Sequence, residues 1–269
     1  ANTVLKHHSN IHEALKYACA LQLIAYNPSD NVMLPKKTRY IASYYNVEQL
    51  NELLRVVQGD TLETVIRLTA LYGFRRSEVC GLKWSAVDFQ QKTITVRRAA
   101  VMVGTKLECV DKTKTASSYR TLPLTAEMAQ YLRTLKAQHE DAQKLIGMSC
   151  EEDGYVCCWP DGSPLKPEYV SRRFDKLLRE NGLPKIRFHD LRHSAASLLL
   201  ELGFSLKDIQ EWLGHSVLQQ QPISIRTFST RQRSKWRKRL VQYWENAARE
   251  TRAAWDGKAY PIRASLEQL

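Results

Sequence analysis

Apolar residues recur along most of this chain at the three- and four-residue spacing of an amphipathic helix. The first such stretch covers residues 9–25, and the turn-forming run Asn27-Pro28-Ser29-Asp30 ends it. Gly73 is expected to end the helix predicted over 62–72 and to expose Phe74 and the arginines after it, because glycine tolerates the left-handed conformation of a helix C-terminus. The other predicted helices cover 47–57, 125–143, 166–181, 188–202 and 205–213.

A different pattern interrupts the helices in the middle of the chain. Residues 93–103, 106–110 and 119–124 are β-branched or alternate between apolar and polar, as strands do. They predict a three-stranded antiparallel sheet. Before this sheet, Ser77 is expected to cap a short helix whose first turn includes Glu78. The predicted fold class is therefore α+β and mostly helical.

The chain carries an excess of positive charge. Its 269 residues include 40 Lys and Arg against 28 Asp and Glu, with a formal net charge of +12 and a pI near 9.4. Such a balance is expected for a protein whose partner is rich in phosphate. The segment N-V-M-L-P-K-K-T-R-Y, at 31–40, places part of this charge after the first helix and is predicted to be an extended linker.

The composition also argues against several other classes of protein. No apolar run is long enough to span a bilayer, so no membrane partner is expected. Six cysteines form no C-x-x-C pair and are expected to be reduced thiols of a cytosolic protein. Acidic residues do not cluster as two-metal phosphoryl transfer requires, and His and Cys lack a zinc spacing. No metal or cofactor is therefore predicted.

Four residues that are widely separated in the chain suggest a site for one phosphodiester. Arg75 lies in Y-G-F-R-R-S-E, His189 and Arg192 lie in R-F-H-D-L-R-H-S-A-A-S, and His215 lies in L-G-H-S. Arginine stays charged at any working pH and presents a planar fork to phosphate oxygens. The His-x-x-Arg spacing predicts that His189 and Arg192 share one helix face, whereas His193 points away and is predicted to be structural.

These motifs, together with D-K-T-K-T-A-S-S-Y-R-T-L-P-L, resemble those of the tyrosine recombinases, the phage and transposon integrase family, over nearly the whole chain. The resemblance implies that Arg75 and Arg192 hold the non-bridging oxygens of the scissile phosphate and offset the charge of its transition state. It implies that His189 accepts the proton of a nucleophilic tyrosine and that His215 donates a hydrogen bond to the phosphate.

The resemblance assigns the general acid to Lys114, at the tip of a predicted hairpin, with Lys112 as a competing candidate. The sequences of this hairpin motif and of residues 27–37 most resemble those of integrases of conjugative transposons from Gram-positive bacteria. The implied activity is site-specific DNA strand exchange through a 3′-phosphotyrosyl intermediate, without metal or ATP.

The nucleophilic tyrosine of this family is missing, since no tyrosine occurs between Tyr169 and Tyr243. Phe228 keeps the ring and lacks only the hydroxyl, whereas the family's usual spacing from L-G-H-S falls on Ile225. Reading one base earlier across 219–228 can give S-T-T-A-D-I-Y-S-H-L, with a tyrosine at position 225. A frame error in the recorded sequence is therefore an alternative to a substitution at Phe228, and Tyr243 is a third candidate nucleophile. As written, the chain is expected to bind DNA without cleaving it.

The family also implies an organisation and a set of DNA contacts. Residues 1–30 would be the C-terminal part of a helical core-binding domain, 31–42 a basic interdomain linker, and 43–269 the catalytic domain. The segment Leu240–Ala254 would dock on a neighbouring protomer and build a dimer or tetramer on double-stranded DNA, in the bacterial cytoplasm and on the nucleoid when bound. The cations expected to contact DNA are Lys36, Lys37, Arg39, Arg76, Arg172, Arg173, Arg231 and Arg233.

Three other functions remain open. The first is a regulator or decoy that binds recombination sites without cleaving them. Restoring a tyrosine would distinguish it from a recombinase, because only a recombinase would then join DNA. The second is a type IB topoisomerase, which has the same set of catalytic residues, Arg, Lys, Arg, His and Tyr, but usually in motifs of different sequence. The third is a metallonuclease that uses His189, His193 and His215 and that a chelator would inactivate.

Overall fold

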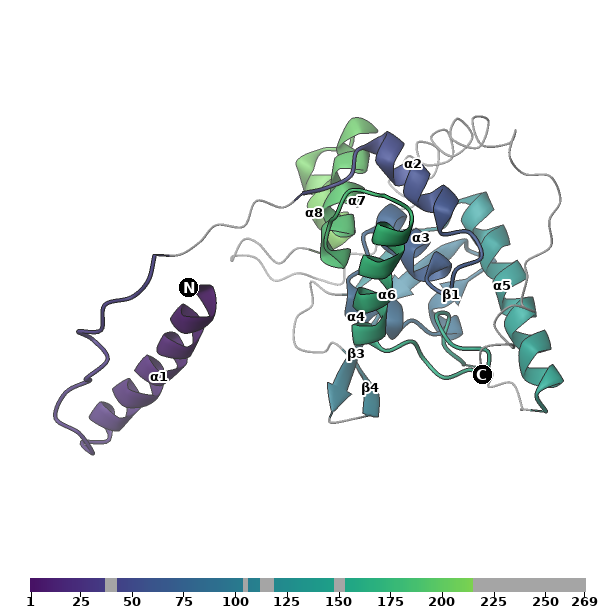
Figure 1. The fold of residues 1–269 in the computed structure, drawn as a ribbon. Coiled ribbons are helices and arrows are strands. Elements are labelled where there is room, and N and C mark those ends of the chain that lie inside the picture. The colour runs from purple at the N-terminus through teal and green to yellow at the C-terminus, as the bar shows by residue number, and fades with distance from the viewer. Residues whose placement is uncertain (37–42, 104–105, 112–118, 148–152, 215–269) are drawn as a thin grey trace. The chain divides into compact units, whose positions relative to one another are not determined.

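The computed structural model describes residues 1–36, 43–103, 106–111, 119–147 and 153–214. The chain divides into two compact units, Ala1–Ala42 and Ser43–Leu269, whose described residues Figure 1 shows as ribbons. Among the described residues, no helix combines the length and the apolar character that a membrane span requires.

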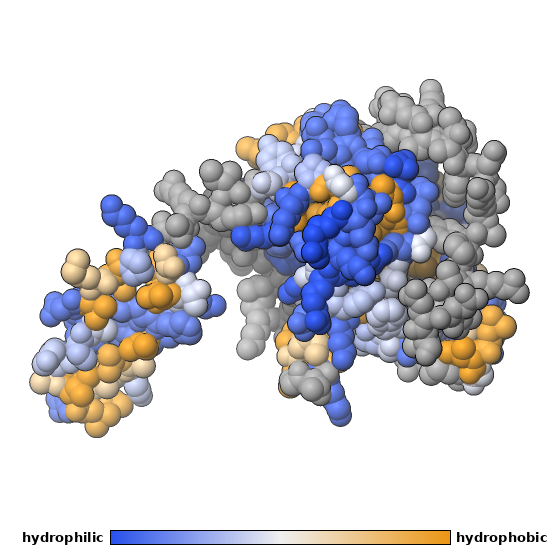
Figure 2. Space-filling view, in the orientation of Figure 1, coloured by the Kyte–Doolittle hydropathy of each residue, from blue (hydrophilic) through white to orange (hydrophobic). Residues whose placement is uncertain are grey.

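The first unit consists of helix α1 (Asn2–Ala20) and a segment that returns along it. The helix predicted over 9–25 was misplaced at both ends, and α1 stops early because Gln22 has a left-handed backbone (φ 58°) that turns the chain. Asn27 is buried and holds the return segment, since its Nδ2 donates to the carbonyl oxygen of His12 at 3.2 Å. Figure 2 shows apolar patches on this unit, whose large exposed apolar residues include Val4, Ile11, Tyr17, Leu21, Leu23, Tyr26 and Met33.

The second unit is built mainly of helices, which match the predicted stretches within a few residues. They are α2 (Val47–Val56), α3 (Glu63–Tyr72), α4 (Arg76–Cys80), α5 (Ala126–Leu145), α6 (Pro167–Glu180), α7 (Leu191–Glu201) and α8 (Leu206–Leu213). Two 3-10 turns, η1 (Trp84–Ala86) and η3 (Phe188–Asp190), precede the first strand and α7. Asn46, Thr125 and Ser205 begin α2, α5 and α8, because their side-chain oxygens accept backbone N–H bonds of the first turn.

The strands form two antiparallel groups rather than the one sheet predicted from 93–103 and the two stretches after it. The strands are β1 (Val87–Asp88), β2 (Thr93–Val96), β3 (Arg98–Val103), β4 (Lys106–Asp111) and β5 (Arg120–Pro123). The three-stranded sheet has the order β1-β2-β5, with Ile94 opposite Leu122, and β3 pairs with β4 in a hairpin. The predicted first strand breaks at the exposed Arg97, because β2 is buried throughout whereas β3 is exposed beyond Ala100. The third strand of the sheet, β1, is too short to show an alternating pattern.

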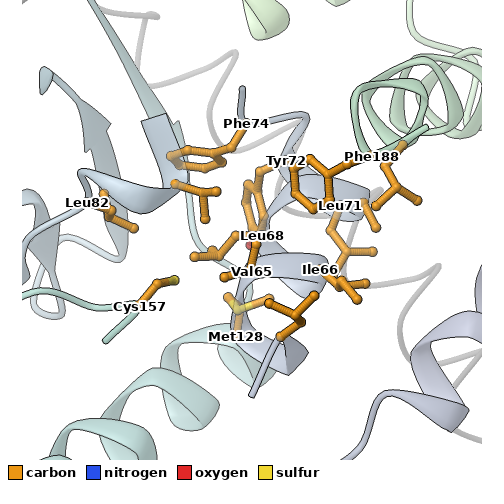
Figure 3. Packing of buried hydrophobic residues seen from close by; sticks show 14 of the residues in the cluster. Val65, Ile66, Leu68, Leu71, Tyr72, Phe74, Leu82, Met128, Cys157 and Phe188 are labelled. Atoms are coloured by element: carbon orange, nitrogen blue, oxygen red, sulfur yellow. The ribbon is translucent and has the colours of Figure 1, made fainter. Parts of the chain in front are cut away.

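Helix α3 is the central element of the core of the second unit. All its residues except Arg67 are buried, and it packs against α2, α4 and α7. Figure 3 shows its apolar side chains among those of Leu82, Met128 and Phe188, which come from other parts of the chain. Because close packing restrains this helix on several faces, the chain that leaves its C-terminal end, including Arg75, starts from a rigid base.

Candidate active site

Arg75 lies just beyond the buried end of α3. Gly73 ends the helix in the left-handed conformation (φ 65°), as predicted, but Phe74 is fully buried rather than exposed. The side chain of Arg75 is 28 % exposed. Arg75, and not the predicted Ser77, is the N-cap of α4, because the carboxylate of Glu78 accepts its backbone N–H at 2.9 Å. The turn at the end of α3 therefore presents Arg75 at the surface of the core.

A fully buried carboxylate orients this arginine. The side chain of Glu78 is 0 % exposed, and its Oε1 accepts a hydrogen bond from Nη1 of Arg75 at 2.7 Å. The same carboxylate accepts two bonds from Arg120, at 3.3 Å on Oε1 and 2.9 Å on Oε2. Arg120 begins β5, is 3 % exposed, and places its guanidinium 5.7 Å from the centroid of the Phe74 ring. A buried carboxylate needs such pairing, because its desolvation alone is unfavourable by several kcal/mol.

Arg192 joins the ends of two helices. It is 2 % exposed, and its Nη1 and Nη2 donate to the carbonyl oxygens of Gly73 and Leu213, the C-terminal ends of α3 and α8. Burial, together with the positive charges of Arg75 and Arg120, lowers the pKa of the Arg192 guanidinium to about 9. The guanidinium therefore remains charged at neutral pH and satisfies two carbonyls that helix termini leave without partners.

The end of α8 also contacts Arg75. Nη2 of Arg75 donates to the carbonyl oxygen of Gly214 at 2.8 Å, and Gly214 directly follows Leu213. Packing at this point is close, since a Cβ atom on Gly73 would lie 2.2 Å from Cδ2 of Leu213. The structure thus brings together the two arginines that the sequence predicted to share a site. They bind consecutive carbonyls at the turn that directly precedes position 215.

His189 lies beside these arginines but does not belong to the same α-helix as Arg192. The stretch predicted as one helix begins with the 3-10 turn η3, so His189 precedes α7 and Arg192 lies in its first turn. The ring of His193, which we expected to point away, lies edge-on to that of His189 with centroids 5.8 Å apart. Although His189 is exposed overall, partial burial lowers its pKa, and the positive charges of His193, Arg192 and Arg75 also lower it. A neutral imidazole near pH 7 is therefore favoured.

The cations predicted to contact DNA differ in how far neighbouring acids neutralise them. Lys36, in the first unit, is exposed. Arg76, in the second unit, is also exposed and donates to Oγ of Ser171 on α6. Arg172 has 76 % of its side chain exposed and lies 3.5 Å from an equally exposed Glu168. These three cations are accessible to an external phosphate.

Arg173 is engaged within the protein to a greater extent. Its side chain is 26 % exposed, pairs with Asp60 and donates from Nη1 to Glu180 at 2.8 Å. Ion pairs within the chain compete with a phosphate for the same guanidinium protons. Of the two neighbouring arginines on α6, Arg172 is therefore better placed than Arg173 to bind an anion.

The remaining predicted site residues lie outside the part of the chain that the structure describes, and their roles stay predictions. They are Lys37, Arg39, Lys112, Lys114, His215, Ile225, Phe228, Arg231, Arg233 and Tyr243, together with the segment Leu240–Ala254. Among the residues that are described, no group of three or more His, Cys, Asp or Glu side chains is placed to hold a metal ion.

Sequence reasoning missed Arg120 and the full role of Glu78. A signal was present, because Arg120 shares its strand face with the buried Leu122 in the motif R-T-L-P. An arginine in phase with core residues requires a buried acceptor. The sequence offered no means of identifying which acid supplies it.

The described part of the second unit is thus a mostly helical α+β domain that gathers arginines around a buried carboxylate. The family model described as the phage integrase family matches residues 44–223. The chain belongs to this family.

Three curated relatives illustrate the likeness in sequence. A tyrosine recombinase XerC-like protein of Caldanaerobacter subterraneus subsp. tengcongensis is 27 % identical over 183 residues, covering 64 % of this chain and 47 % of that protein. The ICEBs1 integrase of Bacillus subtilis is 26 % identical over 196 residues, covering 72 % and 53 %. Tyrosine recombinase XerC of Bacillus pumilus is 31 % identical over 222 residues, covering 80 % and 67 %. The chain spans about half the length of the first two relatives.

Solved structures show the likeness in fold. The Tn1549 transposon integrase in complex with a circular intermediate DNA matches with a TM-score of 0.67 at 18 % identity, covering 100 % of this chain and 80 % of that chain. A lambda integrase dimer bound to a core site matches with a TM-score of 0.52 at 18 % identity, covering 81 % and 74 %. These neighbours confirm the predicted fold class, a mostly helical tyrosine-recombinase catalytic domain with a small antiparallel sheet.

Proposed function

We propose that this chain is a form of a site-specific DNA recombinase of a mobile element, an enzyme that cleaves and rejoins the strands of double-stranded DNA, and that the chain as written lacks the nucleophilic tyrosine. The observation that carries the proposal is the convergence of Arg75 and Arg192, from distant parts of the chain, on one turn beside His189. Membership of the phage integrase family supports this assignment, as do the integrases of mobile elements among the relatives.

In this proposal the two arginines stabilise the phosphate in different ways. Arg75 is 28 % exposed and is the direct donor to a non-bridging oxygen. Arg192 is 2 % exposed, and both its terminal nitrogens donate to carbonyls, so it acts through its charge. Loss of one donor of this kind typically raises a barrier by about 3–4 kcal/mol.

Four further residues would complete the reaction. A tyrosine phenol oxygen bonds to phosphorus while the bond from phosphorus to the 5′ oxygen breaks, which leaves a 3′-phosphotyrosyl link. His189 accepts the phenol proton, Lys114 donates a proton to the leaving 5′ oxygen, and His215 donates a hydrogen bond to the phosphate. Attack by the 5′-hydroxyl of a partner strand reverses the step, so the bond energy is conserved.

Basic residues outside this site would hold the rest of the DNA. We propose 1–30 as the C-terminal part of a core-binding domain, 31–42 as its linker and 43–269 as the catalytic domain. Leu240–Ala254 would mediate assembly on DNA. The exposed Lys36, Arg76 and Arg172 would contact phosphates, with Arg173 a weaker contributor, alongside the predicted Lys37, Arg39, Arg231 and Arg233.

The chain as written would bind DNA without cleaving it, because no tyrosine occurs from position 170 to position 242. The vacated nucleophile position is Phe228 or Ile225, according to whether a substitution or a frame error explains the loss. The same absence favours a second function, a DNA-binding regulator that occupies recombination sites. The two functions differ in whether a restored tyrosine recovers the covalent chemistry.

A covalent-trapping assay tests the proposal. Nicked duplexes from the DNA that flanks the gene are incubated with the chain as given, with Phe228→Tyr, and with a version in which the frame across 219–228 is restored. Each sample is resolved on a denaturing gel, where a protein–DNA link slows the labelled strand. A matched Arg75→Ala variant of any active version controls for adventitious cross-linking.

A slowed band from one repaired version, abolished by Arg75→Ala, would support the recombinase and identify the position of its nucleophile. A band from the chain as given would point to Tyr243 or another nucleophile. If no version forms a band although all bind the duplex, the recombinase proposal fails and the regulator is favoured.

A further inference from the structure

Arg120 and Glu78 form an ion pair that is almost completely buried within the second unit. The two side chains are 3 % and 0 % exposed, and they join β5 to α4 across 42 positions of sequence. Replacement of such a pair by apolar side chains is often neutral or stabilising, so a buried pair is weak support for a role in stability alone. The hydrogen bonds of this pair point to a second role, because they also involve Arg75.

Arg75 and Arg120 share the carboxylate of Glu78. Oε1 accepts from Nη1 of Arg75 at 2.7 Å and from Nη1 of Arg120 at 3.3 Å. Oε2 accepts from the backbone N–H of Arg75 and from Nη2 of Arg120, both at 2.9 Å. The two-pronged contact from Arg120 sets the plane of the carboxylate. That plane determines where Nη1 of Arg75 lies.

A second contact leads from Arg120 to the same place. Its guanidinium lies 5.7 Å from the centroid of the Phe74 ring, and Phe74 is fully buried and directly precedes Arg75. Arg120 therefore restrains Arg75 through the backbone on one side and through the carboxylate on the other. Arg120 also begins β5, the strand that follows the segment carrying Lys114.

We propose that Arg120 is a positioning residue that holds the guanidinium of Arg75 in its phosphate-binding geometry through Glu78. Arg120 itself is too deeply buried to touch DNA. The inference rests on the proposed function only in taking the bound anion to be a DNA phosphate, and it concerns a residue with no role in that proposal.

The chain contains a matched control. Arg67, on α3, donates from Nε to the buried Glu63 at 2.8 Å and lies 5.0 Å from the ring centroid of Tyr131. The chemistry is the same as at Arg120: an arginine, a buried glutamate and an aromatic face. Arg67→Met therefore removes a comparable structural contact whose partners do not include Arg75.

Two measurements on the chain as it exists test the inference. The first is the salt dependence of binding to a nicked duplex from the flanking DNA, between about 50 and 200 mM salt, since the slope counts the phosphates neutralised. The second is the mobility of the Arg75 guanidinium by NMR, with its Nε–H signal assigned by its loss in Arg75→Ala. The variants are Arg75→Ala, Arg120→Met, Arg67→Met and the double variant of Arg75 and Arg120. Arg120→Lys, which keeps the charge without the fork, serves if Arg120→Met does not fold.

We expect Arg75→Ala and Arg120→Met each to lower the salt slope by about one, and the double variant to lower it no further. The Arg75 guanidinium becomes more mobile in either Arg120 variant and not in Arg67→Met. If Arg75→Ala lowers the slope while the Arg120 variants change neither the slope nor the Arg75 signal, the inference is overturned and the proposed function is untouched. If Arg75→Ala leaves the slope unchanged, the phosphate clamp of the proposed function fails. The NMR signal of Arg75 still decides the role of Arg120 in that case.

Discussion

Nη2 of Arg75 donates to the carbonyl oxygen of Gly214 at 2.8 Å, across 139 positions of sequence. This hydrogen bond connects the end of α3 to the end of α8, and Arg192 makes a parallel connection to Leu213 and Gly73. The candidate active site therefore also connects the C-terminal ends of α3 and α8. Substitutions here are expected to change both stability and function.

Gly73→Ala is expected to destabilise the protein more than Gly59→Ala. Both glycines have a left-handed backbone, with φ of 65° and 77°, which is unfavourable for alanine by about 1–2 kcal/mol. At Gly73 the new methyl group would also lie 2.2 Å from Cδ2 of Leu213, whereas nothing lies within 4 Å at Gly59. This overlap should add about 1–3 kcal/mol. Urea unfolding measures both losses, and equal losses would contradict the close packing at Gly73.

Arg192→Lys should lower the free energy of unfolding although it preserves the charge. A single ammonium cannot reach the carbonyl oxygens of both Gly73 and Leu213, so a buried acceptor loses its partner. The expected loss is about 1–3 kcal/mol by urea unfolding. The exposed Arg172→Lys serves as the control and should change stability by less than about 0.5 kcal/mol. A loss no larger in Arg192→Lys than in this control would contradict the two-helix contact.

The pKa of His189 is expected to lie below the ordinary value of about 6.5. Burial contributes most to this shift, and the positive charge of His193 contributes next. His193→Asn removes that charge and should therefore raise the pKa of His189, as measured by an NMR titration of the ring protons. Arg75→Ala should raise the pKa less. A pKa of His189 that does not move in His193→Asn would show that the two rings are not neighbours in solution.

Acid should destabilise the protein through His139. Burial lowers the pKa of this imidazole to about 4, from about 6.5 in an unfolded chain. Between these values the unfolded chain binds a proton that the folded chain does not. The contribution is therefore fully present above pH 6.5 and is lost as the pH falls toward 4, by at most about 1.4 kcal/mol per pH unit.

The acid sensitivity of His139 can be isolated by substitution. The ring packs edge-on against Trp84, with centroids 6.1 Å apart, so His139→Phe keeps an aromatic ring there. Urea unfolding at a series of pH values should show a flatter profile between pH 6.5 and 4 in His139→Phe. His7→Asn, a substitution of an exposed histidine in the first unit, should retain the parent profile. An unchanged profile in His139→Phe would assign the acid sensitivity to other groups.

Local sequence patterns determined where most helices lie, where one of them ends and which family the chain resembles. Apolar periodicity located the helices of the second unit, because a helix must bury one face whatever its partner. Gly73 was identified as a helix end because few other residues adopt its backbone conformation. The motifs around Arg75 and Arg192 also indicated the family before any fold was known.

The tertiary structure decided how the remaining features are arranged. The strand predicted over 93–103 divides at the exposed Arg97, because β2 is buried throughout whereas β3 is exposed beyond Ala100, and pairing then follows the packing rather than the order along the chain. Arg75, rather than the predicted Ser77, is the N-cap of α4, because the buried carboxylate of Glu78 accepts the backbone N–H of Arg75.

The composition of the candidate site was likewise decided by contacts between distant residues. Arg120 meets Glu78 over 42 positions of sequence, and Arg192 meets Gly73 over 119. The sequence determined which residues could carry charge into the core, because residue type and periodicity are local properties. Only the folded chain determined which acceptor each charge meets, because a buried guanidinium takes whichever carboxylate or carbonyl the packing of the helices brings within reach.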